Sequence, residues 1–233
     1  MPSYAQFCPV AKAAELLCER WMPLILRELM CGSARFGEIQ RGVPTLSPSL
    51  LARRLRQLEA AGVIDRITDD GRPHYQLTPA GWELFPLIEA MGVWGQRWAR
   101  SDYSTEELDP AFLMWDIRRM VQAPGLSSRE CVVEFWIRDA SPHRSTYWMV
   151  VDSDSVDLCL VDPSKEVHLR VEAELRAITQ VWMGDRTMPD AIAAGQITLL
   201  GEPRLAARFV TWLGRHPRLG GVARAHPTPT AGR

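Results

Sequence analysis

The stretch SPSLLARRLRQLEAAGVIDR, residues 47–66, decides the fold of the first part of the chain. Ser47 is a favoured helix N-cap and Pro48 a favoured first helical residue, while Gly62 is a favoured stop. Between them an apolar stripe recurs at the spacing of one helix face, formed by Leu51, Leu55 and Leu58. The pattern predicts an amphipathic helix over residues 47–60 that buries one face in a core.

The opposite face of this helix concentrates positive charge. From residue 39 to residue 58 there are four arginines and no Asp or Glu, although the chain has a formal net charge of −1. Arg53 and Arg56 lie opposite the apolar stripe, and Arg54 lies at its flank. Guanidinium groups bind phosphates and guanine edges, so the pattern favours a polyanionic ligand. A solvated surface helix would show the same charges.

The elements around this helix complete a DNA-binding arrangement. Two helices are expected within residues 9–31 and a third over 36–43. After the charged helix, alternating residues predict a β-hairpin over 63–78 with its turn at 69–73, and a long helix follows. Helices followed by a two-stranded hairpin make a winged helix-turn-helix, in which one helix enters the major groove of DNA.

The candidate DNA contacts follow from this arrangement. The N-terminus of a helix favours an anion, and short serine side chains there let the backbone approach a phosphate. Arginines on the exposed face can reach phosphates or guanine edges, and an arginine on the hairpin turn can reach the backbone or the minor groove. The predicted DNA-binding residues are Ser47, Ser49, Arg53, Arg54, Arg56 and Arg72.

Composition and charge divide the chain into parts. Residues 1–101 carry two more basic than acidic side chains, whereas residues 102–214 carry seven more acidic than basic ones. The polar stretch 102–110 is expected as a linker, and residues 215–233, rich in Pro, Gly and Arg, as a disordered basic tail. The predicted domains are therefore a DNA-binding and dimerisation domain over 1–101 and a second domain over 111–214.

The second domain is predicted to be a mixed sheet with helices, which makes the whole chain α+β. Four segments between residues 131 and 173 alternate like strands, and a fifth strand is expected at 196–201. Helices are expected at 111–121, 175–183, 189–194 and 202–214. The region has no nucleophile elbow, no glycine-rich nucleotide loop and no metal-ligand spacing. We therefore expect no enzyme, no cofactor and no metal site.

The first part of the chain also carries a set of motifs in a fixed order. They are Cys8-Pro9, Leu16, Leu17, Trp21, Arg35-Phe36, Leu51, Arg54-Leu55, Leu58-Glu59, Leu77-Thr78 and Gly81. With them, residues 7–100 resemble the HxlR-type winged-helix transcriptional regulators of bacteria. The resemblance implies a homodimer, formed mainly by the first and last helices of the domain, on a palindromic operator. It also implies a recognition helix at 47–60 and a wing at 69–73.

Cys8 is a candidate for a second kind of regulation. Some members of the resembled family sense electrophiles or oxidants through a cysteine at this position. A thiol that precedes a helix is favoured as the reactive thiolate. The alternative function is therefore a redox- or electrophile-responsive regulator in which the second domain is structural or binds a protein. Cys18 and Cys31 are expected in the core.

The second part of the chain resembles another family. The pattern is carried by Gly184, Ala191, Gly195, Ile197, Leu199 and Gly201, within the order of strands and helices over residues 132–214. It is similar to sterol-carrier-protein-like domains, which implies a cavity for a hydrophobic molecule between the sheet and the helices. The candidate pocket residues are Phe135, Trp136, Trp148 and Trp182, although aromatic residues at such positions also form ordinary cores.

These observations predict a dimeric, sequence-specific, DNA-binding transcriptional regulator whose affinity for DNA responds to an apolar small molecule. The expected partners are double-stranded operator DNA, a second copy of the chain and a hydrophobic effector. No apolar run is long enough to span a membrane, and the N-terminus lacks the pattern of a signal peptide. We therefore expect a cytoplasmic protein with no membrane partner.

Overall fold

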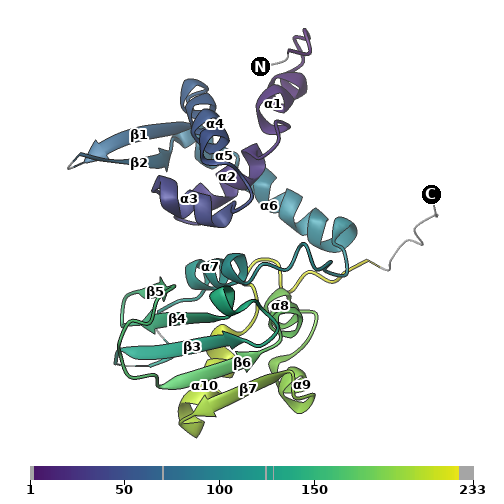
Figure 1. Ribbon diagram of the computed structural model, residues 1–233. Helices are drawn as coiled ribbons and strands as arrows, with labels where there is room; N and C mark the ends of the chain where they lie inside the picture. Colours follow the sequence, from purple (N-terminus) through teal and green to yellow (C-terminus); the bar gives the residue numbers. More distant parts are fainter. Residues whose placement is uncertain (1–2, 70, 124, 128, 226–233) are drawn as a thin grey trace. The chain divides into compact units, whose positions relative to one another are not determined.

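The chain divides into two compact units, Met1–Met91 and Gly92–Arg233 (Figure 1). The computed structural model describes residues 3–69, 71–123, 125–127 and 129–225. Each unit has its own hydrophobic core, so the fold combines two separate globular parts. Among the described residues, no helix is both long and apolar enough to cross a lipid bilayer.

The first unit is a winged helix-turn-helix, as the sequence predicts. Its strands β1 (Ile64–Asp69) and β2 (Arg72–Leu77) form an antiparallel hairpin. Its helices are α1 (Pro9–Leu17), α2 (Met22–Met30), α3 (Phe36–Gly42), α4 (Pro48–Ala60), α5 (Pro79–Glu83) and α6 (Phe85–Trp94), of which the last extends into the second unit.

Helix α4 is built as its sequence pattern predicts. The Ser47 hydroxyl caps the helix by accepting a hydrogen bond from the backbone N–H of Leu50 at 3.4 Å. Its apolar stripe is buried in the core of the first unit, where Leu51, Leu55 and Leu58 are at most 1% exposed. Burying a leucine side chain contributes about 1.5–3 kcal/mol, so this stripe holds the helix in place.

The hairpin is fastened to the end of α4 by Thr78. Its hydroxyl donates to the Gly62 carbonyl at 2.7 Å and also accepts from the backbone N–H of Gly81 at 3.1 Å. Gly81 has no room for a side chain, because a Cβ atom there would lie 2.2 Å from the Val63 carbonyl oxygen. The wing therefore has a fixed origin relative to α4.

The long helix predicted after Thr78 is interrupted. Helix α5 ends at Glu83 and α6 begins at Phe85, and α6 is followed by a π-helix, η1 (Gly95–Ala99). Pro86 lacks the N–H that a continuous helix would use at this point, which explains the break.

The second unit contains a five-stranded mixed sheet in the order β5-β4-β3-β6-β7. Strands β3 and β6 are parallel, and the other neighbours are antiparallel. The strands are β3 (Cys131–Ile137), β4 (Thr146–Val151), β5 (Val156–Cys159), β6 (Leu169–Ala173) and β7 (Ile197–Gly201). The helices are α7 (Pro110–Met120), the 3₁₀ turn η2 (Pro142–Arg144), α8 (Leu175–Met183), α9 (Met188–Ala193) and α10 (Pro203–Leu213). The predicted α+β class is confirmed.

The α-helices of the second unit share one core with one face of the sheet (Figure 1). On β3 the residues that point into this core are Cys131, Val133, Phe135 and Ile137. Residues between them face the other side, because side chains alternate along a strand. That second face carries polar as well as apolar residues, and Arg170 there forms an ion pair with Glu134 at 3.1 Å.

The segments expected as linker and tail are structured where they are described. Segment 102–110 belongs to the second unit, and Arg224 forms an ion pair with Asp102 at 2.9 Å. In the predicted tail, His216 is buried and its backbone N–H donates to the Trp182 carbonyl at 2.6 Å. Residues 215–225 therefore make specific contacts within the second unit, with α8 through His216 and with residues 97–102 through Arg224 and Ala225, whereas disorder is the prediction. Residues 226–233 lie outside the described residues.

Candidate functional site

Helix α4 presents a polar, positively charged face. Ser47, Ser49, Arg53 and Arg56 are all exposed, and the two serine hydroxyls lie 3.3 Å apart at the start of the helix. Arg53 and Arg56 point away from the core, because the buried leucine stripe occupies the other side of the helix. This face combines a helix N-terminus with two exposed guanidinium groups, which is the chemistry needed to contact phosphates and base edges.

Arg54 does not belong to this face. Its side chain is buried and forms an ion pair with Glu19, and it donates from Nε to the Arg20 carbonyl at 3.1 Å. A further bond runs from Arg54 Nη1 to Gln57 Oε1 at 2.8 Å. Position 54 follows Leu51 by three residues, so the side chain lies on the buried stripe and links α4 to the α1–α2 connection. The prediction that Arg54 contacts DNA is corrected accordingly.

The wing adds Arg72, which is exposed at the first position of β2 opposite Asp69. Gly71 beside it has a positive φ of 73°, a conformation that favours glycine in a tight turn. The predicted wing, residues 69–73, includes residue 70, which lies outside the described residues. Arg72 is therefore presented on a narrow hairpin that projects from the core of the first unit.

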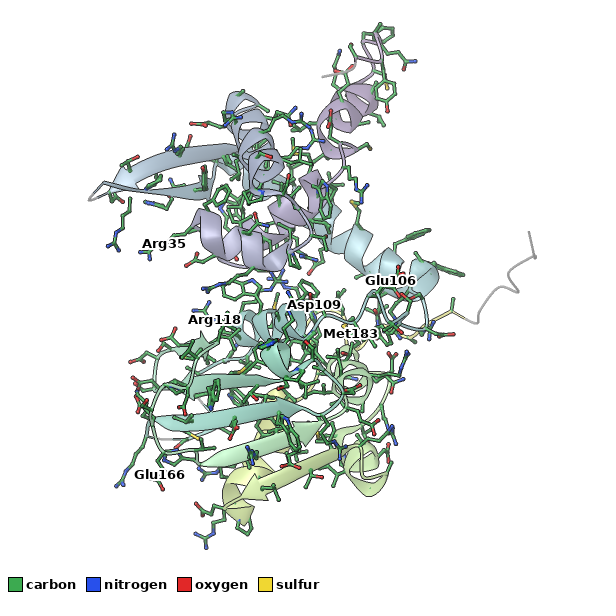
Figure 2. All side chains as sticks on the ribbon, viewed as in Figure 1. Arg35, Glu106, Asp109, Arg118, Glu166 and Met183 are labelled. Atoms are coloured by element: carbon green, nitrogen blue, oxygen red, sulfur yellow. The ribbon has the colours of Figure 1, made fainter. Side chains whose placement is uncertain are left out.

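A further arginine, Arg35, joins Arg72 at a shared hollow. This hollow has a volume of about 840 Å³ and is lined by Gly32, Ala34, Arg35, Glu38, Asp69, Arg72 and His74. Figure 2 shows Arg35 beside α3, on the side of the hairpin. In the sequence, Arg35 stands only within a family motif, although an arginine immediately before a helix is a signal that identifies it as a candidate contact.

The four predicted pocket residues are not brought together. Phe135 and Trp182 are buried on the helical side of the sheet, whereas Trp136, 37% exposed, and Trp148 lie on the opposite face. Phe135 packs on Phe209 with ring centroids 5.9 Å apart, as in an ordinary core. Since neighbouring residues on a strand point to opposite faces, Phe135 and Trp136 cannot line one cavity.

Two hollows lie within the second unit instead, and Trp182 borders both. The larger has a volume of about 630 Å³ and lies between α10, the end of α7 and the segment after α10. The smaller, of about 410 Å³, is bordered by η1, the segment 100–109, α7 and α8. Three acidic residues line the smaller hollow, namely Glu107, Asp109 and Asp116. Its one arginine, Arg100, forms an ion pair with Asp185.

A buried polar cluster formed by Asp116, Trp182 and His216 lies beside these hollows. Trp182 Nε1 donates to Asp116 Oδ2 at 2.7 Å, and His216 Nε2 lies 3.8 Å from the same oxygen. Burial acts to raise the pKa of Asp116, but the charge of Arg119, the charge that His216 carries when protonated and the Trp182 hydrogen bond outweigh it and hold the pKa below 3.8. Burial also lowers the pKa of His216 below 6.5, against the opposing effect of Asp116. At neutral pH the cluster therefore contains an ionised Asp116 and an uncharged His216.

The cysteines have different environments. Cys8 is the N-cap residue of α1 and is partly exposed, with its carbonyl accepting from the backbone N–H of Lys12 at 3.1 Å. Cys18 was expected in the core but is exposed, because α1 ends at Leu17 and residue 18 is its C-cap. Cys31 is partly buried. Among the described residues, no group of three or more metal-ligating side chains could hold a metal ion.

Comparisons with known proteins identify the first unit. Residues 16–103 match the HxlR-like helix-turn-helix family. The chain is 35% identical over 113 residues to the uncharacterized HTH-type transcriptional regulator YvaP of Bacillus subtilis. This alignment covers 47% of this chain and 96% of YvaP. It is 41% identical over 92 residues to the uncharacterized HTH-type transcriptional regulator Rv3095 of Mycobacterium tuberculosis. This alignment covers 38% of this chain and 58% of Rv3095.

A solved structure, the reduced form of the transcriptional regulator YodB from B. subtilis, is 34% identical with a TM-score of 0.35. The alignment covers 39% of this chain and 93% of YodB. The residues matched by the family, 16–103, include α4 and both strands of the wing. The chain therefore belongs to the HxlR-like helix-turn-helix family of DNA-binding transcriptional regulators.

Proposed function

We propose that the protein is a homodimeric regulator that binds a specific operator through α4 and the wing, and whose DNA affinity is controlled by an apolar small molecule bound in the second unit. The observation that carries the DNA-binding part is the exposed set Ser47, Ser49, Arg53 and Arg56 on α4, with Arg72 on the wing. A major-groove helix supplies sequence readout, and the surrounding arginines supply phosphate contacts. No catalytic step is part of this function.

Dimerisation is supported by an exposed apolar stripe on α6. Leu87, Met91 and Trp94 are between 52% and 60% exposed, and their spacing of four and three residues places them on one helix face. Trp98, also 60% exposed, continues the same spacing into η1. Large apolar side chains in a contiguous exposed row mark protein interfaces. The first helix contributes Val10, 75% exposed, to a surface that a second copy would cover.

The effector role of the second unit is supported by its architecture. Its mixed sheet is covered by helices on one face, in the order of elements that the resemblance to sterol-carrier-protein-like domains implies. The unit also contains hollows of a size suited to small molecules. To act as a switch, a ligand must bind one conformation of the regulator more tightly, and coupling of about 1–3 kcal/mol is typical.

A gel shift on the DNA upstream of the gene tests the proposal. The purified protein should retard this DNA, and an extract of cell lipids and metabolites should release or tighten the complex. Failure to retard specific DNA over competitor DNA at moderate salt would contradict the regulator function. Retardation that no extract fraction changes would contradict the effector role and leave the second unit with a structural or protein-binding role.

Redox sensing through Cys8 is a second candidate, supported by the position of the thiol. Cys8 immediately precedes the nine-residue helix α1 and is partly exposed, so an oxidant can reach it. Treatment with diamide should then change the gel shift of the unmodified protein but not that of Cys8→Ser. Cys18→Ser, which alters another exposed thiol, is the matched control. An equal diamide response in both variants would rule out Cys8 as the sensor.

A further inference from the structure

Two arginines without acidic neighbours line the larger hollow of the second unit, called here the α10 hollow. Arg208 lies on α10 and Arg215 lies just after it, and both are exposed. The residues lining the hollow include no Asp or Glu. Within the described part of the chain, neither arginine forms an ion pair or a hydrogen bond. Arg208 lies in, and Arg215 directly follows, the region of residues 102–214, which carries seven more acidic than basic side chains.

The helix dipole accounts for only one of these charges. The C-terminal end of α10 carries a partial negative charge, and a cation beside it is favoured by about 0.3–1 kcal/mol. Arg215, two residues beyond the end of α10, can serve this purpose. Arg208 lies five residues before the end of the helix, outside the last turn. Its charge therefore remains available to an anion in the hollow.

Most of the other residues that line the α10 hollow are apolar, and Gln122 and Thr211 add two uncharged polar side chains. Trp212 lies one helical turn after Arg208, and its Nε1 donates to the Gln122 carbonyl at 2.7 Å, which fixes the indole plane. The Trp212 ring packs on Phe209 at 5.9 Å, and Phe209 reaches the core of the sheet. The other apolar lining residues include Met120, Val121, Trp182 and Leu213. A hollow of about 630 Å³ with such walls has the size and polarity of a small-molecule site.

We propose that the α10 hollow binds a free apolar molecule that carries a single carboxylate or similar anionic head group. The head group lies at Arg208 and Arg215, and the apolar body lies against Trp212. The smaller hollow does not suit this ligand, because three acidic residues line it and its arginine is already paired with Asp185. The site is also distinct from the four aromatic residues selected from the sequence, of which only Trp182 borders it.

The position of Arg215 connects this site to the rest of the second unit. The segment that begins at Arg215 is held to α8 by His216 and is held again at Ala225, whose N–H donates to the Arg97 carbonyl at 3.0 Å. A ligand that displaces Arg215 therefore acts on segment 215–225, which is hydrogen-bonded to η1, the element after α6. Identification of the bound molecule as the effector rests on the proposed function, whereas the binding itself does not.

The experiment uses the full-length protein and the fluorescent acid 11-(dansylamino)undecanoate, with its uncharged methyl ester as the comparison. We expect saturable binding of the acid, at least tenfold weaker binding of the ester, and displacement of the acid by dodecanoate. The double variant Arg208→Gln, Arg215→Gln should bind the acid at least tenfold more weakly. Arg204→Gln, an exposed arginine of α10 outside the hollow, should bind it like the unmodified protein.

A blocking variant and a vesicle assay complete the test. Ala207→Trp places a bulky side chain in the hollow without changing its charge, and should abolish binding of the acid. Equal binding of acid and ester, an unaffected double variant, or no saturable binding would each overturn the proposal. Flotation with phosphatidylglycerol vesicles in the absence of dodecanoate binding would instead assign the arginines to a membrane lipid and contradict a free ligand.

A gel shift with and without dodecanoate separates this inference from the proposed function. Binding of the acid with an unchanged gel shift supports the site and contradicts its effector role. Binding of the acid by a protein that retards no specific DNA supports the site and contradicts the regulator function. Specific DNA binding by a protein that does not bind the acid overturns the site alone.

Discussion

Arg53, Arg54 and Arg56 are close in sequence but have different surroundings. Arg53 and Arg56 are exposed, whereas Arg54 lies on the buried side of α4 and is held by Glu19 and the Arg20 carbonyl. The difference follows from the 100° turn between successive helix residues, which carries position 54 to the apolar stripe. At the residue scale, charge type alone therefore does not identify a DNA contact.

Arg53→Ala and Arg56→Ala should each weaken DNA binding without changing the stability of the fold. If each arginine contacts a phosphate, its loss also reduces the slope of log affinity against log salt by about one. Arg72→Ala on the wing should behave in the same way. Fluorescence anisotropy over a salt series measures both effects, and an unchanged affinity in all three variants would contradict the assigned interface.

Arg54→Ala should instead destabilise the first unit by about 1–3 kcal/mol, because Glu19 and the Arg20 carbonyl lose their buried partner. Urea unfolding measures this loss, with Arg53→Ala as the matched control on the same helix. Equal stability of the two variants would show that the Arg54 bonds contribute nothing to folding.

His216 should make the second unit less stable in mild acid. Burial lowers its pKa in the folded state below 6.5, so the unfolded chain binds the proton more readily. Stability is therefore retained above pH 6.5 and is lost as pH falls below that value toward the folded-state pKa. Asp116, whose folded pKa lies below 3.8, contributes a separate loss only in stronger acid.

His216→Asn tests this assignment. The Nδ1 atom of His216 accepts from the backbone N–H groups of Arg218 and Leu219 at 3.2 and 3.1 Å, and an amide oxygen can accept the same bonds without titrating. Urea midpoints of the second unit at pH 7.5 and 5.5 should differ less in the variant than in the unmodified protein. The same pH dependence in both proteins would assign the acid sensitivity to another group.

At the scale of elements, α6 is a helix with little burial of its own. None of its residues is buried, although most of them are apolar. A helix of this composition is expected to find a partner, since exposed apolar stripes carry an interfacial free energy that burial removes. The break at Leu84 and the π-helix after Trp94 limit the α-helical part of the stripe to about three turns.

Met91→Glu should shift the protein from dimer to monomer and weaken operator binding, because the charge would be buried at the proposed interface. Sedimentation velocity measures the assembly state, and the gel shift measures the effect on DNA. Glu89→Gln, an exposed α6 position away from the stripe, is the matched control. A Met91→Glu protein that sediments like the unmodified protein would contradict dimerisation through α6.

At the scale of the whole molecule, the chain has two cores that share no buried residue. The basic α4 face belongs to the first core, and the acidic second unit contains the proposed ligand site. Separate cores allow separate unfolding transitions, since cooperativity depends on shared contacts.

Leu55→Ala and Phe209→Ala should therefore lower different transitions in a calorimetric scan. Each side chain is at most 1% exposed, and truncation of a buried leucine or phenylalanine costs about 2–5 kcal/mol. Leu55→Ala should affect the transition of the first unit and Phe209→Ala that of the second. A single transition lowered equally by both substitutions would show that the units unfold together.

The sequence by itself determined the winged helix-turn-helix, the extent of α4 to within a residue and the sheet-and-helix class of the second unit. It also identified the exposed arginines of α4 and the wing, namely Arg53, Arg56 and Arg72. These features depend on local signals, namely caps, apolar spacing and alternation, which act within a few residues of one another. Only the tertiary structure decided that Arg54 is buried, that Phe135 and Trp182 lie in an ordinary core, and that His216 is bonded to α8. It also revealed that Arg35 lies beside the wing and that Arg208 and Arg215 line the same α10 hollow. Such features depend on contacts between distant segments, whose spacing in sequence carries no information about their proximity in space.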